Sequence, residues 1–169
     1  GKIYTILGRT GAGKTELLRA LMGLNPLTVG TVKLDEEDIT ERPIRARNMS
    51  LVYQQFINYP HLSVLDNVAF PLRRQGKDKA EAHALAGQML TTVGLGEFLQ
   101  RRPAQLSGGQ QQRVAIARSI AKRPTLLLGD ELTGNLDTET SNKVMEALVS
   151  ACKQENITSV FVTHDEGLV

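Results

Sequence analysis

The chain has 169 residues, 41% of them hydrophobic and 22% charged, a composition typical of one globular domain with its own core. A net charge of +2 is too small to predict a nucleic-acid or membrane surface, and aromatic residues, at 4%, are too few to predict base stacking. The single cysteine, Cys152, excludes an internal disulfide, and no apolar run is long enough to span a bilayer. We therefore expect any membrane role to depend on a partner.

Hydrophobic periodicity predicts strands and helices that alternate along the chain. We expect strands at residues 2–7, 31–34, 49–53, 126–129 and 159–163, and helices at 14–22, 78–93, 107–122 and from 137 or 138 to 154. The first strand is expected to be buried, and Leu17, Leu18 and Leu21 are expected to line one side of the first helix. The alternation predicts an α/β fold with a mostly parallel sheet flanked by helices on both faces.

A glycine-rich loop lies between the first strand and the first helix. It reads GRTGAGKT and matches the phosphate-loop pattern G-x-x-x-x-G-K-[ST] in full. Backbone N–H groups and the helix start would surround phosphate oxygens, Lys14 would reach the terminal phosphates, and Thr15 would ligate Mg²⁺. The alternative is an ordinary strand-turn-helix with a surface lysine. The predicted nucleotide-binding residues here are Gly8, Arg9, Thr10, Gly11, Ala12, Gly13, Lys14 and Thr15.

Three polar side chains follow the last two predicted strands. Asp130 and Glu131 come at the end of an apolar strand, and His164 follows the strand SVFVT. Ligands of open α/β sheets bind at the carboxyl ends of parallel strands. We expect Asp130 to hold Mg²⁺ through its water shell, Glu131 to orient or deprotonate an attacking water, and His164 to contact a terminal phosphate. The alternatives are a helix-capping acidic pair and a structural or solvated histidine.

Gln54 follows the strand at 49–53, where a neutral amide could contact both the metal and the water, although the adjacent Gln55 leaves the choice between them open. Further along, Ser107 and Gln110 form a predicted capping box at the start of a helix, which offers a second anion site. Three pairs of basic residues are predicted to be solvated surface: Arg45 with Arg47, Arg73 with Arg74, and Arg101 with Arg102.

Together these motifs resemble the ATP-binding subunits of ABC transporters over essentially the whole chain. GRTGAGKT resembles the Walker A loop, Gln54 the Q-loop glutamine, LSGGQ at 106–110 the signature motif, and LLLGDE at 126–131 Walker B with its catalytic glutamate. The segment 134–137, ending in Asp137, resembles the D-loop, and His164 the switch histidine. The order of the motifs is that of the family, and LSGGQ between Gln54 and the acidic pair is the most specific of them.

The resemblance implies a P-loop NTPase core in a single domain over 1–169, with a helical subdomain at roughly 60–122. It implies that ATP and Mg²⁺ are bound and that hydrolysis drives transport through transmembrane permease subunits. A second ATPase subunit would complete a head-to-tail dimer, in which each ATP lies on one subunit's Walker A loop and under the other's signature residues. These residues are Ser107, Gly108, Gly109 and Gln110, with Asp137 nearby. No nucleic-acid partner is expected, and the implied location is the inner face of a prokaryotic cell membrane.

The chain also departs from the family pattern. Leu132 replaces the usual proline after the acidic pair, and only seven residues precede Gly8, so the adenine-stacking aromatic and the first antiparallel strands are missing. We therefore expect a fragment, with weakened adenine affinity. The stretch 38–74 resembles sugar or glycerol-phosphate importers, whereas 130–137 resembles the lipoprotein-release and macrolide-export branch. Two alternatives stay open: a truncated or chimeric unit that binds nucleotide without turnover, and a non-transport ABC ATPase acting on nucleic acid or ribosomes.

Overall fold

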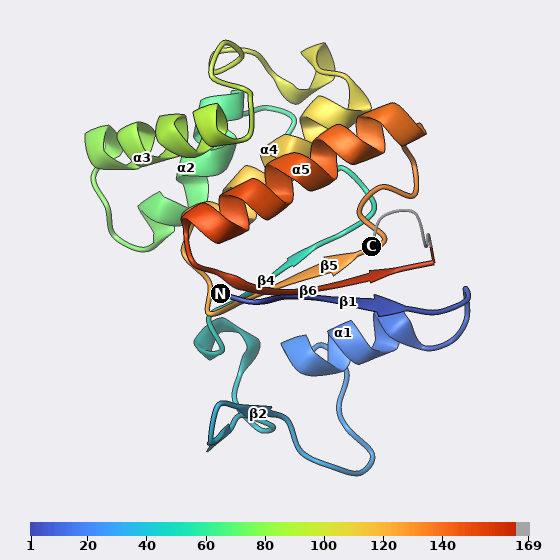
Figure 1. The fold of residues 1–169 in the computed structure, drawn as a ribbon. Helices are drawn as coiled ribbons and strands as arrows, with labels where there is room; N and C mark the ends of the chain where they lie inside the picture. Colours follow the sequence, from blue (N-terminus) through green and yellow to red (C-terminus); the bar gives the residue numbers. More distant parts are fainter. Residues whose placement is uncertain (165–169) are drawn as a thin grey trace.

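Four parallel strands form the central sheet of the molecule (Figure 1). The computed structural model describes residues 1–164, and the strand order is β1-β6-β5-β4. The elements are β1 (Ile3–Leu7), α1 (Lys14–Met22), β2 (Lys33–Leu34), β3 (Glu37–Asp38), β4 (Met49–Val52), α2 (Val64–Arg74), α3 (Lys79–Thr92), α4 (Gly108–Ala121), β5 (Leu126–Asp130), α5 (Thr138–Gln154) and β6 (Thr158–Thr163). Short 3₁₀ turns lie at Ile44–Ala46 and Pro103–Gln105.

Helices cover both faces of this sheet. Figure 1 shows α1 beneath the strands, and α4 and α5 above them with α2 and α3 alongside. Successive strand residues point to opposite faces, so Leu127 packs in the core under α4 and α5, and Leu128 packs in the separate core beside Leu18 of α1. The predicted α/β class, with a parallel sheet between helical layers, is confirmed.

The first strand differs from the prediction, because it is not buried. Among the strands described, β1 pairs with β6 alone and lies at the edge of the sheet, leaving Tyr4 51% and Leu7 46% exposed. On α1, Leu18 is buried but Leu17 is exposed, so the inward stripe runs through Leu18 and Met22. The strand itself was predicted correctly, but its apolar residues alone cannot distinguish a central strand from an edge strand.

Two further elements were not predicted. The strand predicted at 31–34 is present as β2, but it pairs with the unpredicted β3 in an antiparallel hairpin that is separate from the central sheet. The helix α2 was missed because Pro71 lies inside it, where proline removes one backbone hydrogen bond. Its N-terminus is nevertheless well capped, since the Ser63 side chain accepts a hydrogen bond from the backbone N–H of Asp66. No helix in the described part of the chain is both long and apolar enough to cross a membrane.

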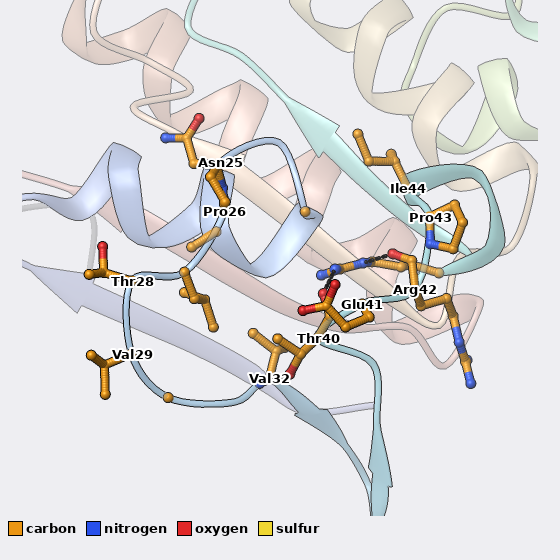
Figure 2. Close-up of a pocket in the computed structure, with 15 residues that line it drawn as sticks. Asn25, Pro26, Thr28, Val29, Val32, Thr40, Glu41, Arg42, Pro43 and Ile44 are labelled. Atoms are coloured by element: carbon orange, nitrogen blue, oxygen red, sulfur yellow. Dashed lines mark hydrogen bonds between the residues drawn. The ribbon is translucent and has the colours of Figure 1, made fainter.

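Arg47 was predicted to be solvated, but it is only 4% exposed. It lies at the wall of a cavity of about 630 Å³, across which residues 25–32 face residues 40–44 (Figure 2). Its guanidinium donates to the carbonyl oxygens of Arg42 (2.8 Å), Leu21 (2.8 Å) and Thr40 (2.7 Å). Because Leu21 belongs to the last turn of α1, the positive charge also stabilises the negative end of that helix. Arg47 therefore fixes the far end of the helix that starts at the glycine loop.

We predict that Arg47→Met lowers the free energy of unfolding by about 3 kcal/mol or more, because three carbonyl oxygens lose their donor in a buried setting. The exposed Arg45, two residues earlier, is the matched control, and Arg45→Met should change stability by less than about 0.5 kcal/mol. Urea unfolding followed by circular dichroism measures both. Equal stabilities of the two variants would show that Arg47 has no such role.

Candidate functional site

The carboxyl ends of the parallel strands bring the predicted site residues to one edge of the sheet. Leu7 pairs in register with Thr163, and Asp130 with Val162. The glycine loop, Glu131 and His164 therefore begin at neighbouring points of the same edge. A cavity of about 500 Å³ at this edge is lined by Leu7, residues 8–10 and His164.

The glycine loop has the backbone geometry that exposes N–H groups to an anion. Gly11 and Gly13 have φ of 84° and 89°, in the left-handed region that only glycine adopts readily. Gly13 immediately precedes α1, and no side chain within residues 1–164 caps this helix N-terminus. The first N–H groups of α1 are therefore not consumed by a capping side chain and can bind a phosphate.

Lys14 is not a surface lysine. It is 9% exposed, and its Nζ donates to the carbonyl oxygens of Gly8 (2.6 Å) and Arg9 (2.9 Å). The same ammonium lies 3.6 Å from Oε1 of Glu131. The alternative of an ordinary turn with a solvated lysine is therefore wrong, and the cation lies between the glycine loop and the predicted general base.

The two predicted metal ligands adjoin each other. Thr15 Oγ1 donates to Asp130 Oδ1 at 3.0 Å, and Asp130 is 9% exposed. A hydroxyl and a carboxylate oxygen are hard donors of the kind that Mg²⁺ prefers. No group of three or more His, Cys, Asp or Glu side chains within residues 1–164 could hold a metal alone. The pair therefore fits an ion that takes its remaining ligands from water and phosphate.

Glu131 is held between two groups. Its Oε2 lies 2.6 Å from His164 Nδ1, and its Oε1 faces Lys14. Its backbone N–H donates to Val162 O at 3.0 Å, and its φ of 49° is uncommon for a non-glycine residue. This conformation aims the carboxylate at the loop. The alternative of a helix-capping acidic pair is wrong, since α5 is capped by Asp137.

Gln54, and not the exposed Gln55, faces the turn that follows Glu131. Its Nε2 donates to Asn135 Oδ1 at 3.2 Å, and a Cβ on Gly134 would come within 2.5 Å of that same nitrogen. The structure thus brings Gln54 beside the turn at 134–135. No hydrogen bond or ion pair described for residues 1–164 joins Gln54 to Thr15 or Asp130, so its predicted metal contact stays a prediction.

The predicted capping box at the start of α4 is confirmed. Ser107 Oγ accepts from the N–H of Gln110 at 3.3 Å, and Gln110 Oε1 accepts from the N–H of Ser107 at 3.0 Å. Gly109 is buried, and a Cβ there would lie 2.3 Å from Cγ2 of Thr140 in the first turn of α5. None of the hydrogen bonds, ion pairs or cavities described within residues 1–164 joins 107–110 to the glycine loop.

Asp137 has a structural task in this chain. It caps α5, accepting hydrogen bonds from the N–H (3.0 Å) and Oγ1 (2.6 Å) of Thr140. These hydrogen bonds hold the pKa of the Asp137 carboxyl below its usual value. The carboxylate is therefore ionised at neutral pH, and its predicted contact with nucleotide stays a prediction.

One polar residue at this edge was not predicted. Gln112 of α4 is fully buried, and its Nε2 donates to Tyr53 O (2.9 Å) and Leu132 O (2.8 Å). The signal was present in the sequence, because Gln112 shares a helical face with Ile116 and Ile120 at four-residue spacing. A polar side chain in an apolar stripe requires buried partners.

Comparisons with known proteins agree on one family. A family model described as "ABC transporter" matches residues 1–134. The Fe(3+) ions import ATP-binding protein FbpC 1 of Pectobacterium atrosepticum is 42% identical over 167 residues, 99% of this chain and 47% of that protein. The spermidine/putrescine import ATP-binding protein PotA of Nitrosomonas europaea is 44% identical over 170 residues, with the same coverage. The chain spans slightly less than half of the length of these relatives.

Two solved structures share the fold over 99% of this chain. The first is cbiO1 from Clostridium perfringens, part of the ABC transporter complex cbiONQ, with a TM-score of 0.90 and 27% identity over 69% of its length. The second is the dimeric bacterial ABC transporter cassette MJ0796, with a TM-score of 0.83 and 34% identity over 76% of its length.

The close contact of Gly109 with Thr140 of α5 predicts that a side chain added at 109 is destabilising and that a smaller residue at 140 restores stability. Gly109→Ala should lower the free energy of unfolding by about 1–3 kcal/mol, because the added Cβ overpacks against the Thr140 methyl. Adding Thr140→Ser removes that methyl and keeps the hydroxyl that bonds Asp137, so most of the loss should return. Urea denaturation of the single and double variants measures this coupling.

Gly87 in α3 is the matched control, because nothing lies within 4 Å of a Cβ built there. Gly87→Ala should stabilise the chain by about 0.5–1 kcal/mol through helix propensity. A double variant no more stable than Gly109→Ala alone would contradict the packing role of Gly109.

Proposed function

The chain belongs to the ABC transporter family, and on that premise we propose that it is an ATPase whose hydrolysis of ATP drives transport through separate membrane subunits. One observation carries the proposal. Lys14, Glu131 and His164 meet at the glycine loop, and Thr15 and Asp130 adjoin beside them. This is the set of groups that phosphoryl transfer to water requires: a cation, a base and oxygen ligands for a metal.

The loop residues would hold the phosphates of ATP. Backbone N–H groups at Gly11, Gly13 and the start of α1 supply uncapped donors. The Lys14 ammonium, which here donates to two loop carbonyls, would pair with phosphate oxygens. Thr15 and Asp130 would hold Mg²⁺, which neutralises developing charge on the phosphates when it is bound.

Glu131 is the proposed general base. A water oxygen bonds to the γ-phosphorus, the bond from that phosphorus to the bridging oxygen of ADP breaks, and the water's proton passes to the Glu131 carboxylate. His164 holds the second oxygen of that carboxylate at 2.6 Å, so the base has one orientation. A base placed in this way typically contributes about 10²–10⁴-fold to the rate.

The signature residues would act on ATP held by a second copy. Within one chain, 107–110 make no described contact with the glycine loop, so a nucleotide bound there needs another molecule to reach them. At the start of α4, Ser107 is exposed and Gly108 is half-buried, so the Ser107 hydroxyl and the first N–H group of the helix could reach an anion. One of the similar solved structures, the cassette MJ0796, is dimeric, which supports assembly of this chain with a second copy.

We propose that the membrane partner docks in a groove between the sheet and the helical subdomain at 60–122. The groove, of about 690 Å³, has exposed apolar side chains and cations on its wall, and no Asp or Glu among its lining residues. Burial lowers the pKa of Lys122 and Arg118, and no ion pair described for residues 1–164 gives either cation a carboxylate partner, so a carboxylate from the partner would stabilise their charged forms. The partner segment would therefore be apolar with an acidic residue, and the chain would lie at the inner face of the membrane. The lining residues include Leu24, Ile44, Tyr59, Phe70, Arg45, Arg74, Arg118 and Lys122.

We predict that Glu131→Gln lowers kcat at least about 10²-fold, because the amide cannot take the proton. ATP binding should persist, and ATP should now hold the chain as a dimer. Phosphate release, fluorescent-nucleotide titration and light scattering measure the three quantities. Lys14→Ala should lose nucleotide binding itself, and the exposed Glu146→Gln is the matched carboxylate control with unchanged turnover.

Unchanged turnover in Glu131→Gln would overturn the role of that residue. Tight ATP binding in the same variant without any dimer would count against the head-to-tail arrangement. Nucleotide binding without turnover in the unaltered chain would favour the alternative of a binding unit that does not hydrolyse ATP.

A further inference from the structure

Gln112 connects α4 to two segments that carry site residues. Its side-chain amide donates one hydrogen bond to Tyr53 O and a second to Leu132 O. Tyr53 immediately precedes Gln54, and Leu132 immediately follows Glu131. The buried Gln112 amide therefore fixes the backbone just before Gln54, the predicted metal-contacting residue, and just after Glu131, the predicted base.

The orientation of this amide is determined by its surroundings. Both hydrogens of Nε2 are used, and Oε1 is buried with no hydrogen-bond partner in the described part of the chain. Flipping the amide would place its oxygen against two carbonyl oxygens and lose both hydrogen bonds. A buried amide oxygen without a partner costs free energy, and the two hydrogen bonds that Nε2 donates offset this cost.

The helix that carries Gln112 is joined to the sheet at more than one point. Ser50 Oγ of β4 donates to Ser119 O at 3.0 Å, and Lys122 Nζ donates to Met49 O at 3.0 Å. These contacts tie the later turns of α4 to the early part of β4. Gln112 ties the second turn of α4 to the carboxyl end of β4 and, in addition, to the turn after β5.

The start of α4 is the end at which the second copy's ATP would bind. Gln112 lies five residues after Ser107, which is about 7.5 Å along the helix axis. Because this part of the helix is short, a displacement of the α4 start would also move the Gln112 amide, and with it the backbone at Tyr53 and Leu132. Among the described hydrogen bonds, the one that joins an α4 side chain to Leu132 O is donated by Gln112.

We propose that Gln112 is a positioning residue that makes Gln54 and Glu131 of one copy respond to the nucleotide seated on that copy's own signature motif. This inference rests on the proposed ATPase function. The ATP of one site lies under the signature of the opposite copy, so Gln112 would couple the two sites of the dimer. Its effect on catalysis would be exerted through backbone placement, without contact with ATP.

Hydrogen–deuterium exchange of the unliganded chain tests the connection without needing turnover. In Gln112→Met, which matches the length of the side chain but donates nothing, amide exchange in peptides covering 49–58 and 126–136 should rise about five- to tenfold, the factor expected for losing one net hydrogen bond. Peptides from the middle of α5 should keep the exchange of the unaltered chain. Unchanged exchange in the first two peptides, or an equal rise everywhere, would overturn the proposal.

The neighbouring Gln111 is the matched control. It is also an amide on α4, but its Nε2 donates to Leu106 O at 3.2 Å, within the helix's own entry segment. Gln111→Met should leave the peptides at 126–136 unchanged. If Gln112→Met fails to fold, NMR of the unaltered chain decides: adding Mg²⁺ and a non-hydrolysable ATP analogue until the dimer forms should shift the Gln112 side-chain amide together with the backbone amides of 54 and 131. No shift at Gln112 would overturn the coupling.

Turnover separates this inference from the function on which it rests. Gln112→Met should lower kcat about tenfold or more, with KM changed less than about twofold, because substrate contacts remain and the base is misplaced. An unaltered kcat in this variant would overturn the positioning role. If the unaltered chain shows no turnover, the ATPase proposal fails, and the exchange and NMR measurements still decide whether Gln112 links α4 to residues 54 and 131.

Discussion

The site depends on the common direction and register of four strands. Parallel strands present all their carboxyl ends at one edge of a sheet, and short turns then keep the following residues close together. Leu7 is level with Thr163, Asp130 with Val162, and Val52 with Gly129. The glycine loop, the acidic turn and His164, which are far apart in the sequence, therefore meet at this edge, and Gln54 lies beside the end of the acidic turn.

Side chains that donate to backbone carbonyls hold the surrounding elements to this edge. Arg47 joins the end of α1 to the segment at 40–42, and Gln112 joins α4 to the ends of β4 and β5. In the part of the chain that the structure describes, neither side chain has a carboxylate partner. A charge–charge pair tolerates changes in geometry, whereas two or three hydrogen bonds from a planar group to fixed carbonyls specify one arrangement. The elements around the proposed nucleotide site are therefore held partly by residues that would not contact the nucleotide.

The sequence predicted the parts of the fold that local patterns control. Short apolar runs located the four strands of the sheet, and the Ser107–Gln110 spacing predicted a capping box that the structure contains. What it could not predict depends on tertiary surroundings. Arg47 resembles a surface charge in the sequence, and only the structure shows its three carbonyl partners. Likewise, β1 resembles a central strand, and only the structure shows that β6 is its sole neighbour among the described strands. The role of Glu131 was predicted from its place after a strand. That Lys14 and His164 contact its carboxylate could be known only from the register of the strands.

The capping roles of Ser107 and Asp137 have different consequences for a nucleotide. Ser107 Oγ accepts a hydrogen bond from Gln110, and a hydroxyl that accepts one bond still has a hydrogen to donate to a phosphate oxygen. Capping and anion binding are therefore compatible at Ser107. The Asp137 carboxylate can only accept hydrogen bonds, and it already accepts two, from the N–H and the Oγ1 hydroxyl of Thr140. An ionised carboxylate repels phosphate, so Asp137 could take part in an ATP-bound dimer only through N–H or O–H donors of the second copy.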